Sequence, residues 1–240
     1  MMYSLVTGAT RGIGKAAAKM LLERGDFVFI NYANSDETAE NVQKEFAPFA
    51  DRFDIVKADL SNLNGVDILF QAVHQRTKTL DNLVLNAAVT HRCSFEDITP
   101  EIWNRIFDTD LTIPFFTVQK FSPILSEGAS IVFLGSLIGI HPHAVSLPYG
   151  VAKAGVVMLA QSLVKVFRTR NITVNTVVPG FTDTEWQKTK SPELRQRIES
   201  KIALRRFGLP EEVAKAIVAV LENKYMNGAT VVVDGGYCME

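Results

Sequence analysis

The stretch TGATRGIG, residues 7–14, decides the fold. It follows the short apolar run YSLVT at residues 3–7 and opens a helical pattern, which is the setting of a dinucleotide-binding turn. In such a turn Gly8 permits the sharp reversal of the chain, Gly12 lets the backbone approach a pyrophosphate, and Gly14 lets the helix pack on the sheet. The phosphates then meet free N–H groups at the positive end of the helix. Because glycines also cap ordinary turns, this interpretation depends on the strand before the turn.

Further short apolar runs alternate with longer amphipathic segments along the chain. They are FVFINY (27–32), FDIVKAD (53–59), NLVLNAA (82–88), SIVFLGS (130–136), ITVNTVV (172–178) and ATVVVDGG (229–236). Strands that alternate with helices predict a parallel sheet covered on both faces. We therefore expect one α/β domain over residues 1–240, a Rossmann-type doubly wound parallel sheet of about seven strands with helices on both faces. Ligands of such sheets bind at the carboxyl ends of the strands.

The composition argues against several classes of protein. The 240 residues include 25 basic and 26 acidic ones, a formal net charge of −1, so no overall field favours nucleic acid or an anionic membrane. No apolar run reaches the roughly 18 residues of a membrane span, and MMYSLVTGAT at residues 1–10 does not resemble a cleavable signal. The two cysteines, Cys93 and Cys238, fit a reducing compartment. We expect a cytoplasmic protein without nucleic-acid or membrane partners.

The stretch YGVAK, residues 149–153, places a phenol and an ammonium on one face of a helix. A free tyrosine, with a pKa of about 10, exchanges protons poorly near neutral pH. An ammonium about 4 Å away would stabilise the phenolate by up to roughly 4 kcal/mol at an effective dielectric of 20, or about three pKa units. Lys153 is therefore expected to make Tyr149 acidic. Alone, the same spacing also describes an ordinary snorkelling pair.

Together these motifs resemble the short-chain dehydrogenases/reductases, over essentially the whole chain, and most closely the 3-oxoacyl-(acyl-carrier-protein) reductases. The chain also has NAAV at residues 86–89, similar to the family's NNAG, VVPGF at 177–181 and NGATVVVDGG at 227–236. Leu85 and Ala88 depart from NNAG. The resemblance implies that Tyr149 donates a proton to a carbonyl oxygen as hydride arrives from the cofactor. It also implies that Lys153 holds the nicotinamide ribose and that Ser136 binds the substrate oxygen.

The fourth member of the family's catalytic set is an asparagine, and Asp110 stands in its place. In the family the backbone carbonyl at this position holds a water that links the lysine to solvent. Pro114 cannot donate a helical hydrogen bond to the Asp110 carbonyl, which leaves that carbonyl free for water. We expect the carboxylate to stabilise the charged form of Lys153 as well.

The cofactor is expected to be NADP(H) rather than NAD(H). An NAD-preferring enzyme has a carboxylate at the end of the second strand, where this chain has Tyr32, and Arg11 in the glycine turn can reach a phosphate. Asp36 or Glu37, if turned toward the ribose, would reverse the preference, and Arg11 is otherwise a solvated cation. The expected cofactor contacts are Gly8, Thr10, Arg11, Gly12, Ile13, Gly14, Asn31, Tyr32, Asp59, Leu60, Asn86, Ala87, Ala88, Tyr149, Lys153, Pro179, Gly180, Thr182 and Thr184. By resemblance Asp59 contacts adenine, with a helix N-cap as the alternative, and residues 179–184 fix the carboxamide of the nicotinamide ring.

The loop after Ser136 and the region of residues 181–207 are expected to form the substrate walls and a mobile lid. The small-molecule carbonyl substrate that the resemblance implies would meet a mainly apolar lining, which would fit a ketone on an apolar or acyl body. The expected members of this lining are Leu137, Ile138, Ile140, Val145, Phe181 and Trp186. The lid is basic, which is typical of a solvated helix face but would also suit a phosphopantetheine or a carboxylate. His141 and His143 lack a third ligand at useful spacing, so no metal is expected.

Partners are predicted from two further features. The segments 102–121 and 151–167 are apolar on nearly every side, which favours a homo-oligomer, a tetramer or a dimer, over a thick core. Arg170 matches one carrier-docking arginine of the resembled reductases, but Glu127 lies near the place of the other; acyl carrier protein is thus a candidate partner. The first substrate expected is a 3-oxoacyl thioester. A steroid, sugar or quinone ketone and a catalytically silent NADP-binding regulatory protein are the alternatives.

Overall fold

A computed structural model describes residues 1–239. Its seven strands form one parallel sheet in the order β3-β2-β1-β4-β5-β6-β7, so the predicted doubly wound fold is confirmed. The strands are β1 (Tyr3–Val6), β2 (Phe27–Tyr32), β3 (Phe53–Lys57), β4 (Leu80–Leu85), β5 (Leu125–Leu134), β6 (Thr173–Pro179) and β7 (Thr230–Val233). The strand order reverses at β1, whose neighbours are β2 and β4. The crevice for a ligand is expected at this switch point.

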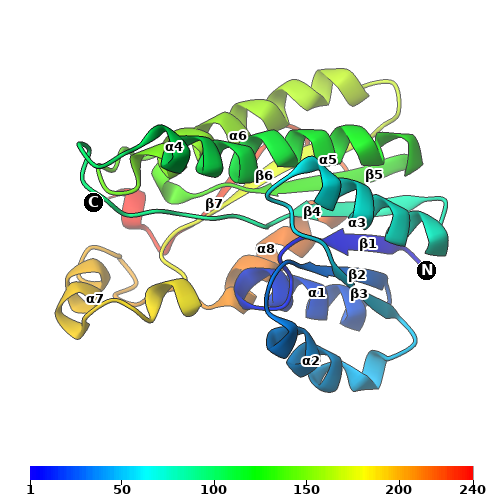
Figure 1. Ribbon diagram of the computed structural model, residues 1–240, viewed down its shortest axis with the longest axis horizontal. Helices are drawn as coiled ribbons and strands as arrows, with labels where there is room; N and C mark the ends of the chain where they lie inside the picture. The colour runs from blue at the N-terminus through cyan, green and yellow to red at the C-terminus, as the bar shows by residue number, and fades with distance from the viewer. Residues whose placement is uncertain (240) are drawn as a thin grey trace.

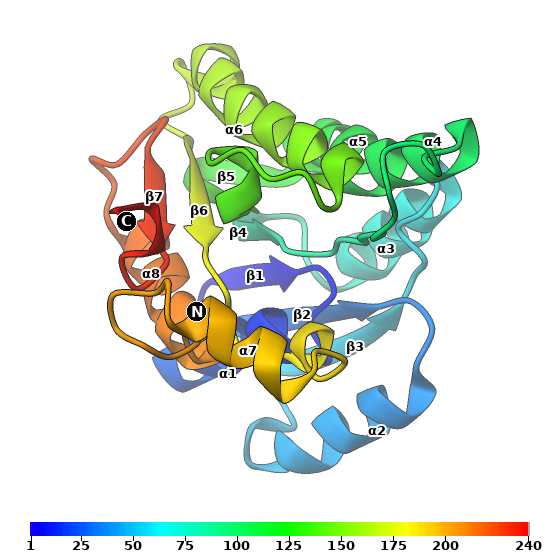
Figure 2. The same cartoon turned by 90° about the vertical axis from the view of Figure 1, so that its left-hand side faces the viewer.

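Helices cover both faces of the sheet (Figures 1 and 2). The helices are α1 (Gly12–Arg24), α2 (Asp36–Glu45), α3 (Leu63–Arg76), α4 (Pro100–Phe107), α5 (Ile113–Phe121), α6 (Leu147–Phe167), α7 (Pro192–Glu199) and α8 (Pro210–Glu222). Short turns complete the structure: η1 (Ala47–Phe49), η3 (Ser122–Ile124), η4 (Leu137–Gly139), η5 (Glu185–Gln187), η6 (Tyr237–Met239) and the π-helical η2 (Asp108–Thr112). Helices α3 to α6 lie on one face, and α1, α2 and α8 lie on the other.

Alternate residues of each strand enter two separate cores. Leu5 of β1 and Leu83 of β4 point into the core under α3, α5 and α6. Their neighbours Val6 and Val84 point into the core over α1 and α8. Successive strand side chains alternate between faces, and both faces are covered. This double burial explains why the strands read as continuous apolar runs.

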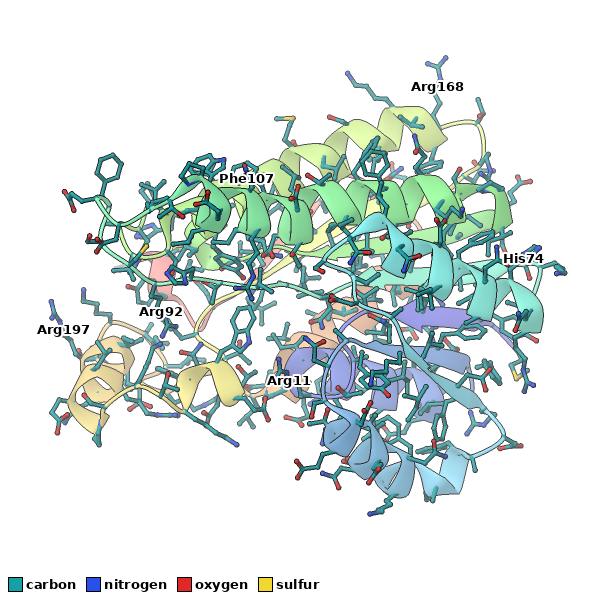
Figure 3. The ribbon with its side chains drawn as sticks, viewed as in Figure 1. Arg11, His74, Arg92, Phe107, Arg168 and Arg197 are labelled. Atoms are coloured by element: carbon teal, nitrogen blue, oxygen red, sulfur yellow. The ribbon has the colours of Figure 1, made fainter. Side chains whose placement is uncertain are left out.

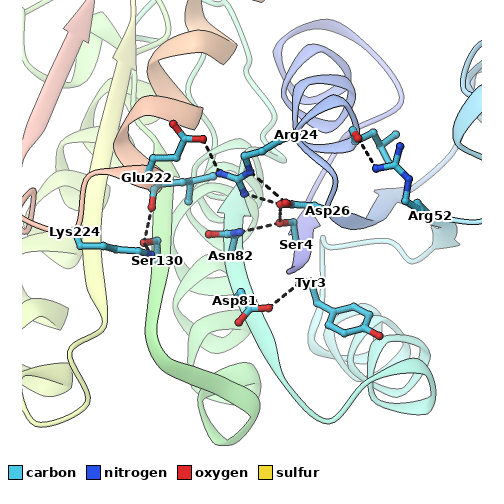
Figure 4. A network of polar contacts seen from close by, with 12 residues as sticks. Tyr3, Ser4, Arg24, Asp26, Arg52, Asp81, Asn82, Ser130, Glu222 and Lys224 are labelled. Atoms are coloured by element: carbon cyan, nitrogen blue, oxygen red, sulfur yellow. Dashed lines mark hydrogen bonds and ion pairs between the residues drawn. The ribbon is translucent and has the colours of Figure 1, made fainter. Parts of the chain in front are cut away.

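A polar network joins the strands at the edge away from the switch-point crevice (Figure 4). The Arg24 guanidinium lies 2.6 Å from the buried Asp26 carboxylate, which accepts a 2.5 Å hydrogen bond from Ser4 Oγ. Lys224 Nζ donates to Ser130 Oγ over 2.7 Å. A paired and hydrogen-bonded buried charge is tolerated where a single one is costly.

Within residues 1–239, one helix, α6, is long and apolar enough to cross a bilayer by length and composition. It packs on β6 and on η2, and it retains exposed apolar side chains at Val151, Met158 and Val166. Phe115 of α5 is exposed as well. The apolar faces predicted as a subunit interface are therefore not fully covered within one chain.

Candidate active site

A cavity of about 460 Å³ opens where β1, β4, β5 and β6 end, beside the switch point. It runs from the end of β2 to the start of α6 and so connects the glycine turn with Tyr149 and Lys153. Most of the predicted cofactor residues line it: Gly8, Thr10, Arg11, Gly12, Ile13, Asn31, Tyr32, Asp59, Leu60, Asn86, Ala87, Ala88, Tyr149, Lys153, Pro179 and Thr184. Gly14, Gly180 and Thr182 are not among its lining residues. Neither are Ser136 and Asp110.

The glycine turn has the geometry that its sequence requires. Gly8 and Gly12 adopt φ angles of +61° and +54°, which side chains disfavour. A Cβ on Gly14 would lie 2.5 Å from Asn86 Nδ2 and 2.6 Å from the Gly8 carbonyl oxygen. Gly14 therefore serves the packing of α1 on the sheet, while the backbone at Gly8 and Gly12 faces the cavity. The cradle and the cavity fit the pyrophosphate of a dinucleotide.

Two asparagines hold this turn in place. Asn86 Nδ2 donates to the carbonyl oxygens of Thr7 and Gly8, over 2.9 and 3.0 Å. Asn31 Oδ1 accepts from the Gly8 N–H over 3.2 Å, while its Nδ2 donates to the Ala58 carbonyl over 2.9 Å. The ends of β2, β3 and β4 are thus hydrogen-bonded to one another through the turn. Both residues line the cavity, and their side chains are already engaged by the protein backbone.

Tyr149 and Lys153 meet at the inner end of the cavity. Lys153 Nζ lies 5.5 Å from the centre of the Tyr149 ring and donates to the Leu134 carbonyl over 3.0 Å. Ser136, directly after β5, is a hydrogen-bonding partner of the Tyr149 hydroxyl. Trp186 closes the other side, with its ring centre 6.1 Å from that of Tyr149. A phenol, a hydroxyl and an ammonium therefore converge beside the space that the glycine turn borders.

The prediction that its surroundings in the protein make Tyr149 more acidic is wrong, because the combined effect of the chain's own groups is to raise its pKa. Burial raises the pKa of the Tyr149 hydroxyl above its usual value, and the Asp110 carboxylate raises it further. The hydrogen bond with Ser136 lowers the pKa but does not reverse the shift. Tyr149 is therefore held as a neutral phenol, the form that can donate a proton.

Asp110 lies on the π-helical turn η2 and is fully buried. Its Oδ1 accepts from the Val89 N–H over 2.8 Å, and its Oδ2 lies 3.5 Å from Lys153 Nζ. The wider turn, in which the Ile113 N–H donates to the Asp108 carbonyl, occurs just before Pro114 in the chain. Burial raises the pKa of the Asp110 carboxyl and the charge of Lys153 opposes that rise. The carboxylate thus lies beside the lysine, and its stabilisation of the lysine's charge stays a prediction.

At the opposite end of the cavity, the possible acid Asp36 is already engaged. Lys57 Nζ lies 2.7 and 2.8 Å from its two carboxylate oxygens, and the Tyr32 hydroxyl donates to it over 2.8 Å. These hydrogen bonds, that of Lys57 first, hold the pKa of Asp36 below its usual value. Asp36 is therefore ionised but balanced by a cation. Arg11, at the N-terminal end of α1 in Figure 3, is exposed beside the same cavity.

Asp59 also borders this end of the cavity, and its side chain accepts from the Ser61 N–H over 3.0 Å. The alternative role considered for it, an N-cap, belongs instead to Asn62, whose side chain accepts from the Gly65 N–H at the start of α3. Asp59 is thus free of a capping role and remains an exposed carboxylate at the cavity.

The segment after β6 divides into lining and supporting residues. Pro179 and Thr184 border the cavity. Gly180 packs against the backbone of Asp234, which a Cβ would approach to 2.7 Å. Thr182 is buried, and its Oγ1 donates to the Gly180 carbonyl over 3.3 Å. Gly180 and Thr182 therefore support the conformation of the segment, whereas Pro179 and Thr184 are positioned to contact a ligand.

The predicted apolar wall is only partly realised. Trp186 lines the cavity, but Leu137 is buried in the protein and Ile140 and Val145 are exposed. Sequence reasoning missed Val89, Arg105, Thr109 and Glu185, which do line the cavity. Arg105 and Thr109 are four residues apart, so they lie on one helix face, and they come just before Asp110. This spacing could have indicated that both side chains border the site.

A second hollow of about 370 Å³ adjoins the main cavity through Glu185 and Trp186. Arg92, labelled in Figure 3 near α7, lies on its wall together with His91. Burial first, and then the Arg92 guanidinium, lower the pKa of Lys190. Arg92 and Lys190 thus lie near each other at this hollow, whose wall also carries the Glu185 carboxylate. Among residues 1–239, no cluster of three or more potential ligands could hold a metal ion.

Arg170, the candidate for carrier docking, is engaged within the chain. Its NH1 donates to the Ser122 carbonyl over 2.8 Å, and its NH2 donates to the Leu125 carbonyl. Glu127 accepts from Asn171 Nδ2 over 3.0 Å. Arg170 therefore satisfies carbonyls at η3 and at the start of β5.

Comparisons with known proteins agree with this geometry. The family model described as enoyl-(acyl carrier protein) reductase matches residues 8–238. The 3-oxoacyl-[acyl-carrier-protein] reductase FabG of Staphylococcus aureus is 34% identical, over 98% of this chain and 98% of that protein. Two solved structures superpose with TM-scores of 0.92. The angucycline C-6 ketoreductase LanV with bound NADP is 29% identical and covers 100% of this chain, which covers 96% of LanV. A short-chain dehydrogenase from Burkholderia cenocepacia in complex with NADP is 30% identical, with coverage of 99% and 98%. This chain is thus similar to known reductases in sequence and fold over nearly its whole length, and it is an oxidoreductase that belongs to the short-chain dehydrogenase/reductase family.

Proposed function

We propose that this protein is an NADP(H)-dependent carbonyl reductase in which one domain, residues 1–240, both binds the cofactor and performs the chemistry. The observation that carries the proposal is that Tyr149 and Lys153 line the same cavity as the glycine turn, with Ser136 as a hydrogen-bonding partner of Tyr149 behind the cavity wall. A nucleotide lying along this cavity would bring its reactive ring to the phenol.

The proposed chemistry divides proton and hydride transfer. NADPH, when bound, supplies the hydride that adds to the carbonyl carbon. Tyr149 donates its hydroxyl proton to the carbonyl oxygen, which becomes the alcohol, and the resulting phenolate recovers a proton from solvent. Ser136 holds the oxygen by a hydrogen bond, and Lys153, fixed by Leu134 and Asp110, stabilises the phenolate while it lasts. Alcohol oxidation is the same sequence reversed.

The preference for NADP(H) is supported by the charges at the end of β2. Asp36, the acid that would repel a 2′-phosphate, is balanced by Lys57 and bonded to Tyr32. Arg11 supplies a further cation at the cavity. Both solved relatives described above contain NADP.

The first substrate proposed is a 3-oxoacyl thioester, since the Staphylococcus aureus relative is named for that activity. Arg92 on the wall of the second hollow and the nearby Lys190 are cations that suit the phosphate of a pantetheine arm, although the Glu185 carboxylate borders the same hollow. A polycyclic ketone is the second candidate. The Trp186 ring lies beside Tyr149, and Arg170 donates to a carbonyl of its own chain instead of being available to a carrier protein. LanV, a ketoreductase of angucyclines, has the same fold.

A homo-oligomer remains part of this proposal, with α5 and α6 as its interface. The exposed apolar side chains of Val151, Met158 and Phe115 support it. A cytoplasmic location and acyl carrier protein as partner stay predictions.

Binding and turnover together test the function. NADPH and NADH are titrated by fluorescence, and nicotinamide oxidation is then followed with a panel that contains acetoacetyl thioesters, polycyclic ketones, steroids and sugars. We expect tighter NADPH binding and oxidation with at least one ketone, abolished in Tyr149→Phe. Tight binding with no oxidation across the panel would instead favour the cofactor-binding regulatory protein.

A further inference from the structure

Asp110 carries a charge where the resembled family has a neutral amide. Its Oδ1 accepts the Val89 N–H, a bond that an asparagine could make equally well. Its Oδ2 is buried without a hydrogen-bond partner and lies 3.5 Å from Lys153 Nζ, and neither side chain is more than 3% exposed. The carboxylate therefore adds one thing to the site, a buried negative charge beside the lysine.

The charged and titratable groups near Tyr149 come from several elements. Lys153 lies on α6 itself, Asp110 on η2, Arg105 on α4 and Glu185 on η5, and the last two border the same cavity. His141 and His143 follow η4; His143 contacts Val145, and His141 contacts the Tyr237 ring. Lys153 and Asp110 are buried, whereas Tyr149 keeps part of its surface exposed, so among these groups the charges of Lys153 and Asp110 are the least screened by water.

The lysine alone would favour the phenolate, but its charge is shared. Lys153 Nζ donates to the Leu134 carbonyl and faces the Asp110 carboxylate on another side. The pKa of Tyr149 is raised by burial and then by Asp110. A neutral residue at position 110 would leave the lysine's charge to act on the phenol without this opposition.

Building on the proposed reductase function, we infer that Asp110 is a positioning residue which keeps Tyr149 protonated and thereby favours carbonyl reduction over alcohol oxidation near neutral pH. Reduction consumes the hydroxyl proton of Tyr149, so it requires the phenol. Oxidation moves the alcohol proton onto the phenolate, so it requires the ionised form. Asp110 thus extends reduction to more alkaline solution and shifts the onset of oxidation to higher pH.

The test compares Asp110→Asn with Asp108→Asn. Asp108 lies on the same π-turn but is exposed, so its replacement removes an equal charge from the same element. In Asp110→Asn the alkaline limb of reduction and the acidic limb of oxidation should both move down by about one pH unit, as one charge within roughly 10 Å implies at an effective dielectric of 20. Asp108→Asn should move neither limb. Asp110→Ser, which keeps an acceptor for Val89, replaces the asparagine variant if that variant does not fold.

A second readout needs no turnover. The ring ζ-carbon resonances of the five tyrosines are followed by NMR against pH in the NADP⁺ complex, with Tyr149 assigned from Tyr149→Phe. We expect Tyr149 to titrate about one pH unit lower in Asp110→Asn than in the wild type and in Asp108→Asn. Equal titration in all three overturns the inference, whatever the ketone panel shows. A shift in Asp110→Asn without turnover of any ketone supports the effect of Asp110 on the protonation of Tyr149 and removes the proposed function.

Discussion

Replacing Lys57 by methionine should weaken the binding of NADPH and leave that of NADH nearly unchanged. In the wild-type protein Lys57 Nζ contacts both carboxylate oxygens of Asp36, just outside the cavity wall that Tyr32 and Ser35 form. The charges of Lys57 and Asp36 nearly cancel at the position of a nearby phosphate. Without the lysine, Asp36 stays ionised at pH 7, and the net charge at this corner falls by one.

The size of the effect follows from Coulomb's law. One extra negative charge about 8 Å from a doubly charged 2′-phosphate, in a water-like dielectric, weakens binding roughly fivefold. Stability should hardly change, because the Lys57 and Asp36 side chains are 54% and 62% exposed and such pairs contribute little. The unphosphorylated ribose of NADH carries no charge for Asp36 to repel.

Fluorescence titration at low and high salt measures this effect. The loss of NADPH affinity should shrink at high ionic strength, where such charges are screened. Lys44→Met, at the other end of α2, is the matched control because it removes the same charge roughly 12 Å along the helix from Asp36. The double variant Lys57→Met, Asp36→Asn should recover most of the lost affinity. An equal loss for NADPH and NADH would refute the reasoning, because it would indicate a change in shape rather than in charge.

Three further outcomes follow from the geometry. Tyr149→Phe should lower turnover by about 10²- to 10⁴-fold while NADPH binding changes little, since only the proton donor is lost. Single-turnover assays and fluorescence titration measure the two effects. Turnover close to that of the wild type would mean that another group donates the proton. Gly14→Ala should lower the free energy of unfolding by about 1–3 kcal/mol, because its Cβ would lie 2.5 Å from Asn86. The melting temperature should fall by roughly 2–4 °C per kcal/mol. Gly208→Ala is the control and should melt like the wild type, because a Cβ on Gly208 meets nothing closer than 3.8 Å. Arg206 and the Leu209 N–H hold the pKa of Glu212 at about 2, against 4.5 for the free group, so its stabilisation is complete above about pH 4.5 and lost toward pH 2. Glu212→Gln should therefore be less stable than the wild type at pH 7, with a difference that closes between pH 4.5 and pH 2 in denaturant titrations.

The strands were the most predictable part of the fold. The run FVFINY coincides with β2, Phe27–Tyr32, because a strand buried on both faces has no polar positions to interrupt it. The turn at Gly8 and the packing of Gly14 were equally accessible, since they depend on residues next to each other in the chain. The resemblance then located Tyr149, Lys153 and Ser136 beside the same cavity.

Contacts between distant segments were not accessible in this way. The engagement of Asp36 depends on Lys57, which reaches it only because β2 and β3 are neighbours in the sheet. Leu137 was expected at the substrate and is buried, because η4 turns the chain directly after Ser136. Arg170 was matched to a carrier-docking arginine, whereas the carbonyls it binds belong to residues more than forty positions earlier in the chain.

The electrostatics of Tyr149 illustrate the same limit at the centre of the site. Helical spacing brings Lys153 to Tyr149, and a pairwise argument from that spacing gives a more acidic phenol. In the fold the lysine's ammonium is also bound to Leu134 and faced by Asp110, and burial raises the pKa of the phenol itself. Burial always penalises the phenolate, and the carboxylate cancels part of the lysine's attraction. The spacing therefore determines which groups meet, whereas the direction of the pKa shift depends on desolvation and on a third charge. A lower pKa for Tyr149 then requires either an added positive charge beside the phenol or the loss of the negative one at Asp110.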